Sequence, residues 1–207
     1  AAILAFFRRE IAAMVAAIPS LLSPAAGVPG DPARLAQRIV AGTVPVVVVG
    51  LLFNDFIEET LRTPAVAAGA LAVGAALMFA AERLGTNRRA EDTVTWLDAV
   101  LIGCAQASAL IPGVSRSGAT ISLGLLLGLR RDAAARFTFL LAIPATLAAA
   151  GKESLELAHM GVSATNAQLM AVGVIVSALV GYITIKYFLR FLAGNRLDVF
   201  AYYRWAL

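Results

Sequence analysis

The sequence predicts an all-α, polytopic helical membrane protein with one re-entrant helical hairpin. Of its 207 residues 60% are hydrophobic and 14% are charged, whereas a soluble domain of this length would expose far more charge. The long apolar runs do not alternate with polar residues, as strands of a lipid-exposed barrel would. Two adjacent apolar segments are each shorter than a membrane crossing. We expect residues 1–207 to form a single transmembrane domain, truncated at both ends because each end lies in an apolar run and no initiating Met is present.

Polar and Pro/Gly-rich stretches divide the first half of the chain into elements. The expected order is the end of a spanning helix at 1–7, its continuation or an interfacial segment at 11–18, a loop at 19–32, a helix at 39–53, a polar loop at 54–63, a span at 64–81 and a charged loop at 82–92. Pro45 should kink or tilt the helix that contains it. Gly69 and Gly74 should let neighbouring helices approach the span at 64–81.

The second half contains further apolar runs. Helices are expected at 137–150 and 167–188, and a last span near Val199. The polar stretch between the two helices contains His159, which we expect to be a solvated loop residue. The single cysteine, Cys104, excludes an internal disulfide and is expected to be an inert buried thiol.

The segment at about 96–129 differs from the other apolar runs. Trp96–Ile111 and Ser115–Leu129 are each shorter than the roughly twenty residues of a full crossing, and Pro112-Gly113 separates them. We predict a re-entrant hairpin whose tip stops near mid-membrane, where only protein or a water-filled cavity can surround irregular backbone. Two short, tilted spans with an exposed loop remain an alternative.

The distribution of basic residues supports this topology. When the loops are assigned alternately, with 96–129 entering and leaving on one side, thirteen basic residues fall on one face, and only Arg62 and Lys152 fall on the other. The positive-inside rule places the richer face in the cytoplasm. Its members are Arg8, Arg9, Arg34, Arg38, Arg83, Arg88, Arg89, Arg130, Arg131, Arg136, Lys186, Arg190 and Arg196.

The break between the two short helices carries the chemistry. The run 112–120 (PGVSRSGAT) combines an arginine, three hydroxyls and two glycines in an apolar region, where a charge is costly and points to a function. Glycines let backbone approach a ligand, and guanidinium matches phosphate oxygens. Ser115 begins the second half-helix, whose first turn offers unpaired N–H groups and the positive end of the helix dipole. We predict a phosphate-binding site.

Several residues of this run are candidates for the site. We expect Arg116, Ser115, Ser117 and Thr120 to be catalytic residues, and Gly113, Gly118 and Arg116 to bind substrate. Alternatives remain open: a structural ion pair for Arg116, and for Ser117 and Thr120 a hydrogen bond back to a helix carbonyl. The glycine spacing nearly matches a P-loop, but Ala119 occupies the lysine position, which argues against an NTPase.

The run 104–122 (CAQASALIPGVSRSGATIS) resembles the second signature of the undecaprenyl-diphosphate phosphatase family, the bacitracin-resistance proteins. The similarity continues at 45–55, 80–82, 128–130, 133–137 and 139–144. The resemblance implies a multi-pass enzyme of the bacterial plasma (inner) membrane, with re-entrant hairpins in an inverted repeat.

The same resemblance implies the reaction and the partners. Undecaprenyl diphosphate would lose its terminal phosphate, which regenerates the lipid carrier for peptidoglycan synthesis, and bacitracin would compete by sequestering that diphosphate. Arg116 would clamp the diphosphate, with Ser115, Ser117 and Thr120 as hydrogen-bonding partners. Membrane lipids are expected as neighbours, nucleic acid is not, and a homo-oligomer is left open.

The chain departs from the family's pattern at the first signature, a glutamate pair followed by a Pro-x-Ser-Ser-x-Gly-His run, which is absent here. A divalent cation, Mg²⁺ or Ca²⁺, is expected because diphosphates favour such ions with carboxylate ligands. We expect its ligands to lie outside this chain.

Two other functions were weighed against a phosphatase. A membrane transporter or flippase for a phosphorylated lipid or anion stays open, because secondary transporters also bind anions at the N-termini of broken helices. A non-catalytic packing subunit ranks last, because it gives no reason for an arginine, hydroxyls and glycines to share one helix break.

Overall fold

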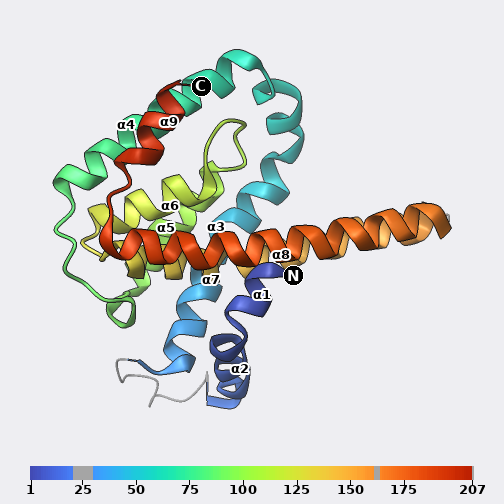
Figure 1. The fold of residues 1–207 in the computed structure, drawn as a ribbon, viewed down its shortest axis with the longest axis horizontal. Helices are drawn as coiled ribbons and strands as arrows, with labels where there is room; N and C mark the ends of the chain where they lie inside the picture. Colours follow the sequence, from blue (N-terminus) through green and yellow to red (C-terminus); the bar gives the residue numbers. More distant parts are fainter. Residues whose placement is uncertain (21–29, 161–163, 207) are drawn as a thin grey trace.

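The computed structural model describes residues 1–20, 30–160 and 164–206, and each regular element in these ranges is a helix (Figure 1). The α-helices are α1 (Ala2–Phe6), α2 (Arg8–Ala16), α3 (Pro32–Phe56), α4 (Pro64–Leu84), α5 (Trp96–Ser108), α6 (Arg116–Leu126), α7 (Arg131–Met160), α8 (Ala164–Gly194) and α9 (Asp198–Ala206). Shorter elements are 3₁₀ turns at Ile18–Ser20 and Glu91–Thr93 and a π-helical turn at Ile57–Leu61.

Four of these helices are long and apolar enough to cross a membrane, which confirms the prediction of an all-α, multi-pass membrane protein. The candidate spans are Pro32–Phe53, Pro64–Leu84, Arg131–Leu157 and Asn166–Gly194. Their outward faces carry large apolar side chains, of which Leu51 is 80% exposed and Val73 70%. Such exposure suits contact with lipid chains rather than water.

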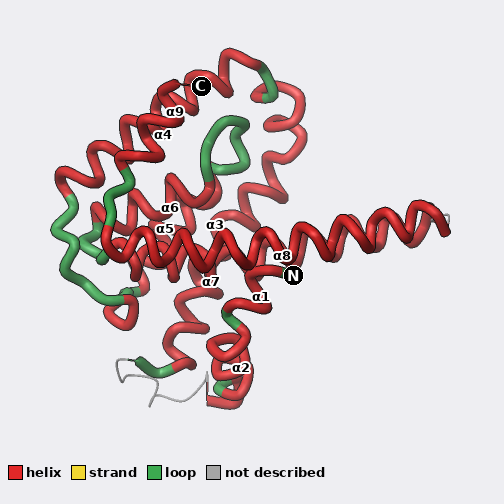
Figure 2. The backbone as a smooth tube through the Cα atoms, in the orientation of Figure 1, coloured by secondary structure: helices red, strands yellow, loops and turns green. Residues whose placement is uncertain are grey.

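The two short helices between α4 and α7 have the expected hairpin lengths. α5 has 13 residues and α6 has 11, so at 1.5 Å per residue they extend about 20 Å and about 16 Å, short of the roughly 30 Å hydrocarbon core. They pack against each other and lie between α3, α4 and α7. Figure 2 shows the irregular loop that joins them, residues 109–115, here called the tip. The depth of this tip in a membrane stays a prediction.

Several predicted boundaries in the first half were wrong. α3 begins at Pro32 and reaches Phe56, and the π-helical turn continues to Leu61, so the polar stretch 54–63 is mostly helical. This stretch contains no glycine or proline, and Arg62 pairs with Glu58 one turn earlier at 3.2 Å. α4 likewise extends to Leu84, beyond the predicted end of its span. The predicted loop 19–32 lies largely outside the described residues.

The second half needs similar corrections. α7 continues through 152–160, so His159 lies in the last turn of a helix rather than in a loop, although its side chain is exposed as expected. Polar side chains on this exposed helix interact one turn apart, as Lys152 does with Glu156 at 3.8 Å. The span expected to begin near Val199 corresponds to α9, whose described residues pack on α4.

The hairpin is held against α3 by a close backbone approach. Gly103 of α5 faces the backbone of Gly42 in α3 so closely that a Cβ at Gly103 would overlap the Gly42 carbonyl. Neighbouring Ala99 and Ile102 are buried in the same interface and are 0% and 1% exposed. Small residues therefore set the distance between the hairpin and the spanning helices.

We predict that Gly103→Ala destabilises the protein, because its Cβ would separate α5 from α3. A loss of about 1–3 kcal/mol in the free energy of unfolding, typical of overpacking, should appear as a lower Tm in detergent. The matched control is Gly173→Ala on α8, where no atom lies within 4 Å of the added Cβ. An unchanged Tm for Gly103→Ala would contradict the proposed close contact.

Candidate active site

The N-terminus of α6 has the geometry of an anion site. Ser115 is the N-cap residue, with extended backbone, and its Oγ accepts a hydrogen bond from the Gly118 N–H at 3.1 Å. The first backbone bond of the helix runs from the Ala119 N–H to the Ser115 carbonyl at 2.9 Å. The N–H groups of Arg116 and Ser117 therefore have no helical partner, and the helix dipole makes this end positive.

The Arg116 side chain is available for an anionic ligand. It is exposed, and its Nη1 donates to Oγ1 of Thr146 in α7 at 3.3 Å. Within residues 1–20, 30–160 and 164–206, no carboxylate forms an ion pair with it, so the structural ion pair considered from the sequence is not observed. Thr146 borders a cavity of about 250 Å³ between α1, α7 and α8. The guanidinium thus keeps donors free and contacts a residue that lines this cavity.

The hydroxyls of the motif take different positions. Thr120 is 0% exposed, and its hydroxyl donates to the Arg116 carbonyl at 2.8 Å while accepting from Thr138 of α7 at 3.1 Å. This is the back-bond that the sequence left open, and it places Thr120 beneath the first turn. Ser117 is half-buried, and its hydroxyl has no hydrogen-bond partner in the described chain. Ser117 is therefore better placed than Thr120 to contact a ligand.

Two glycines of the motif, one in the tip and one in the first turn of α6, lie close to α4. Gly113 has φ +88°, a conformation that side chains disfavour, and a Cβ there would overlap the backbone of Ala67. A Cβ at Gly118 would meet the end of the Met78 side chain, which would have to move aside. These two predicted substrate-binding residues therefore set how the tip packs, and Gly118 also bonds to Ser115.

Arg204 of α9 contacts the tip and was missed by the sequence reasoning. Its Nη2 donates to the Gly113 carbonyl at 2.7 Å and to the Ala70 carbonyl of α4 at 3.4 Å. The sequence does contain a pattern that indicates this residue. Arg204 is the only charged residue in the apolar run 199–207, and charged residues within membrane segments often mark functional positions.

The other end of the hairpin, its base, is closed by Arg89. The guanidinium pairs with Asp98 at the start of α5 at 2.6 Å and donates to the Leu127 carbonyl after α6 at 2.9 Å. The backbone adds to this closure, because the Arg89 N–H donates to the Gly128 carbonyl at 2.8 Å. Thr95 and Asp98 also form a capping box on α5. The two helix ends are therefore held together at the base.

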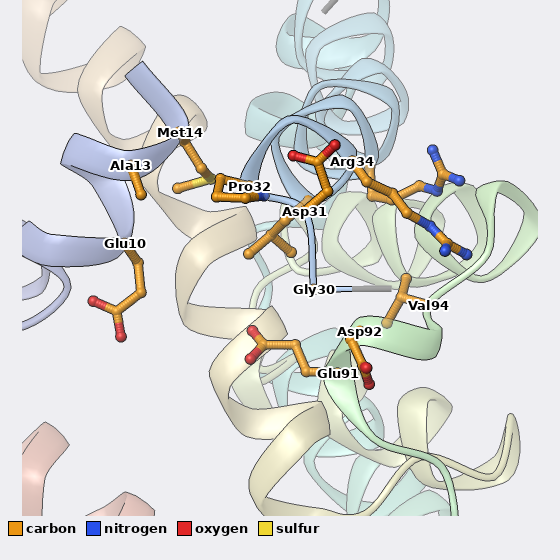
Figure 3. A pocket seen from close by; sticks show the side chains of 12 residues that line it. Glu10, Ala13, Met14, Gly30, Asp31, Pro32, Arg34, Glu91, Asp92 and Val94 are labelled. Atoms are coloured by element: carbon orange, nitrogen blue, oxygen red, sulfur yellow. The ribbon is translucent and has the colours of Figure 1, made fainter. Parts of the chain in front are cut away.

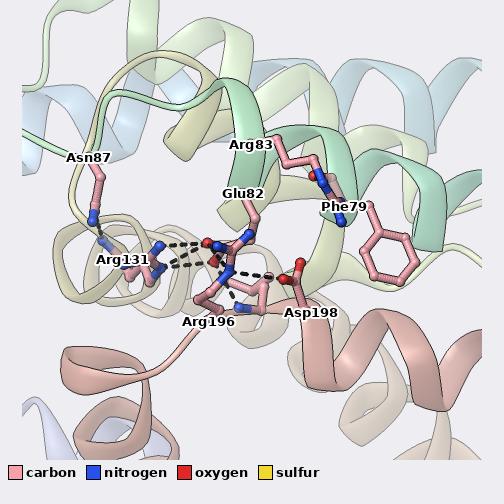
Figure 4. Close-up of polar contacts among 8 residues, drawn as sticks. Phe79, Glu82, Arg83, Asn87, Arg131, Arg196 and Asp198 are labelled. Atoms are coloured by element: carbon pink, nitrogen blue, oxygen red, sulfur yellow. Dashed lines mark hydrogen bonds and ion pairs between the residues drawn. The ribbon is translucent and has the colours of Figure 1, made fainter.

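A buried carboxylate joins the basic ends of three helices (Figure 4). The Glu82 side chain is 0% exposed, accepts two-pronged bonds from Arg131 at 2.6 and 2.9 Å, and accepts the Leu197 N–H at 2.7 Å. Arg196 lies 3.6 Å from the same carboxylate. The distribution of basic residues predicted that these ends of α4, α7 and α8 lie on the same side of the membrane. In the structure they are in contact through Glu82.

A cavity of about 220 Å³ opens near the base between α2, α3 and the 3₁₀ turn at 91–93 (Figure 3). Its lining includes the carboxylates of Glu10, Asp31, Glu91 and Asp92. Arg136 bridges two of them, at 2.8 Å from Glu10 and 3.1 Å from Glu91. In the part of the chain that the structure describes, no group of three acidic, histidine or cysteine side chains could hold a metal ion, so the residues present do not form the expected divalent-cation site.

An apolar groove of about 320 Å³ runs between α3, the π-helical turn and α5. Ile111 of the tip and Cys104 of α5 both line it. The prediction of a buried thiol was wrong, because Cys104 lies on the outer face of α5 and is exposed. Its surroundings are apolar, as the sequence suggested.

Comparisons with known proteins show which family the sequence matches. The family model described as bacitracin resistance protein BacA matches residues 1–207. The undecaprenyl-diphosphatase of Rubrobacter xylanophilus is 43% identical over 206 residues, which covers 100% of this chain and 76% of that protein. The undecaprenyl-diphosphatase of Nitrosococcus oceani is 44% identical over 204 residues, covering 98% and 76%. Undecaprenyl-diphosphatase 2 of Stutzerimonas stutzeri is 42% identical, covering 99% and 76%.

The Glu91 carboxyl gives a prediction for pH dependence. Burial raises its pKa above the ordinary value of 4.5, Arg136 opposes the rise, and the Glu10 and Asp132 charges add to it. Between the ordinary and the raised pKa the folded state binds more protons than the unfolded state, so this group costs stability as pH rises through that window.

We therefore expect Glu91→Gln, which cannot ionise, to gain stability relative to wild type as pH rises from about 4 to about 7. The measurement is the difference in Tm between the two proteins in detergent at each pH. A difference that stays constant or moves in favour of wild type would contradict the raised pKa.

Proposed function

Because the chain belongs to the bacitracin resistance protein BacA family, we propose that it hydrolyses the terminal phosphate of undecaprenyl diphosphate. The observation that carries the proposal is the N-terminus of α6, where two N–H groups without helical partners and the exposed guanidinium of Arg116 belong to the same turn. An oxyanion is the ligand that such donors select. The same reaction regenerates the lipid carrier for peptidoglycan synthesis and explains competition by bacitracin for the substrate.

The described residues would supply the groups that bind the phosphate and neutralise its charge. In phosphoryl transfer the protein mainly positions the group and neutralises charge on its oxygens. Arg116 would bind two oxygens of the terminal phosphate through its planar fork, and the first turn of α6 would donate its N–H groups to another. Ser117 can add a hydroxyl donor, while Ser115 and Thr120 keep that turn in shape through their own hydrogen bonds.

The surroundings fit an amphiphilic substrate in a bacterial inner membrane. An apolar groove lies between α3, the π-helical turn and α5, and Ile111 of the tip is part of its lining, so an isoprenoid chain lying beside α5 would bring its head group toward the tip. A divalent cation remains part of the proposal for the diphosphate, but its ligands are not among the described residues.

A transporter or flippase for a phosphorylated lipid is the alternative that the half-helices also fit. Both functions need an anion at the N-terminus of α6. They differ in whether the phosphate bond breaks, so the product separates them.

We predict that Arg116→Ala lowers phosphate release from undecaprenyl diphosphate by at least about 10²-fold, the typical effect of removing one oxyanion donor. Arg116→Lys should recover little of it, because a point charge replaces the planar fork. The measurement is phosphate release by the full-length protein in detergent with divalent cations present.

The matched control is Arg83→Ala, which removes an exposed arginine from α4 whose guanidinium donates to the Phe79 carbonyl at 3.2 Å. Normal turnover by Arg116→Ala would overturn the assigned site. Movement of intact substrate between leaflets, without phosphate release by the folded wild type, would favour the transporter.

A further inference from the structure

We propose that Arg204 is a positioning residue for the phosphate site, acting from α9 on the tip of the hairpin. This inference rests on the proposed function, because it assumes that the first turn of α6 binds phosphate. Its test measures binding of an anion and does not require turnover. Arg204 lies 91 positions from Gly113 in the sequence, yet its guanidinium donates to the Gly113 carbonyl at 2.7 Å. Gly113 precedes by two residues the Ser115 N-cap, which begins the anion-binding turn.

The arginine itself is held in place by α4. The Ala70 carbonyl accepts a second bond from the same Nη2 at 3.4 Å. α9 is anchored on that helix by ring contacts of Phe79 with Tyr202 and Trp205, at centroid distances of 4.9 and 6.3 Å. Arg204 therefore connects the tip to a rigid support rather than to a free chain end.

The bond fixes the direction of a carbonyl that would otherwise act against the site. Gly113 has a positive φ, and the bond that spans it within the tip runs from the Val114 N–H to the Ile111 carbonyl at 3.2 Å. A carbonyl oxygen free to turn toward the N-terminus of α6 would repel a phosphate and compete for its N–H donors. Arg204 holds this oxygen and keeps the first turn open for the anion.

Arg204 also adds a charge that no described carboxylate neutralises. None of the ion pairs found in residues 1–20, 30–160 and 164–206 includes it, and its Nε is buried without a hydrogen-bond partner. A second positive charge behind the tip favours a dianionic or trianionic head group over a neutral lipid.

The structure offers a way to displace this guanidinium without removing it. Gly74 of α4 lies against it, and a Cβ at Gly74 would approach Nη2 to 2.8 Å and Cζ to 3.2 Å. The end of a flexible side chain can move away, so Gly74→Ala should leave the helix intact and shift only the arginine. Gly69→Ala, on the same helix with nothing within 4 Å of its Cβ, is the matched control.

The test measures binding of inorganic pyrophosphate to the full-length protein by calorimetry, which needs no turnover. Arg204→Met should raise the Kd by about tenfold, Arg204→Lys should recover part of the affinity, and Gly74→Ala should resemble Arg204→Met. Gly69→Ala should bind like wild type. In a double-mutant cycle, Arg204→Met should add little to Arg116→Ala, because both changes act on the same turn.

The outcomes separate this inference from a structural role and from the proposed function. A purely structural arginine would lower Tm or yield but leave the Kd of the folded protein unchanged, and that result would overturn the inference. An unchanged Kd in Gly74→Ala with a displaced guanidinium, or a wild type that does not bind pyrophosphate, would overturn it too. Wild type that binds pyrophosphate with the predicted pattern, but releases no phosphate from the lipid, would support the inference and reject the proposed function.

Discussion

The structure depends on one constraint: polar backbone that leaves the helical pattern inside an apolar protein must find partners within the protein. The break between α5 and α6 leaves carbonyl and N–H groups outside the regular helical pattern, and at the predicted membrane depth lipid could not bond to them. Its carbonyl at Gly113 is bonded by Arg204, and its base is closed by Arg89. The surrounding helices therefore serve to make this irregular segment possible.

The two ends of the hairpin satisfy this constraint differently. At the base, side-chain and backbone bonds from Arg89, Thr95 and Asp98 occupy the helix termini. At the tip, the N–H groups of the first turn of α6 remain available beside Arg116. A binding site requires a rigid support and hydrogen-bond donors that have no partner within the protein, because such donors are in position before the ligand arrives.

The basic end of the molecule organises the spanning helices around the hairpin. Glu82 of α4 bonds to Arg131 of α7 and to the Leu197 N–H just before α9. α9 then brings Arg204 into contact with Gly113 of the tip. A fully buried carboxylate favours one arrangement of its donors, because other arrangements would leave a buried charge unpaired at a high cost in free energy. The ion cluster at one end thus determines where α9 lies and which atoms reach the site about a helix length away.

Local patterns explain what could be predicted. Hydropathy identified the apolar helices, the Pro-Gly break identified the hairpin, and a lone arginine among apolar residues identified Arg116, since each signal lies within a few neighbouring residues. Helix ends were harder: 54–63 and 152–160 are polar yet helical, because polarity alone does not end a helix and side chains one turn apart support it.

The sequence by itself determined the membrane class and the short hairpin helices, and it predicted a phosphate site at the break between them. Only the tertiary structure decided that Thr120 bonds inward to α7, that Cys104 faces outward and that Arg204 meets Gly113. These outcomes depend on how helices distant in sequence pack against one another, and packing is set by side-chain shapes on several helices at once, which no local pattern contains.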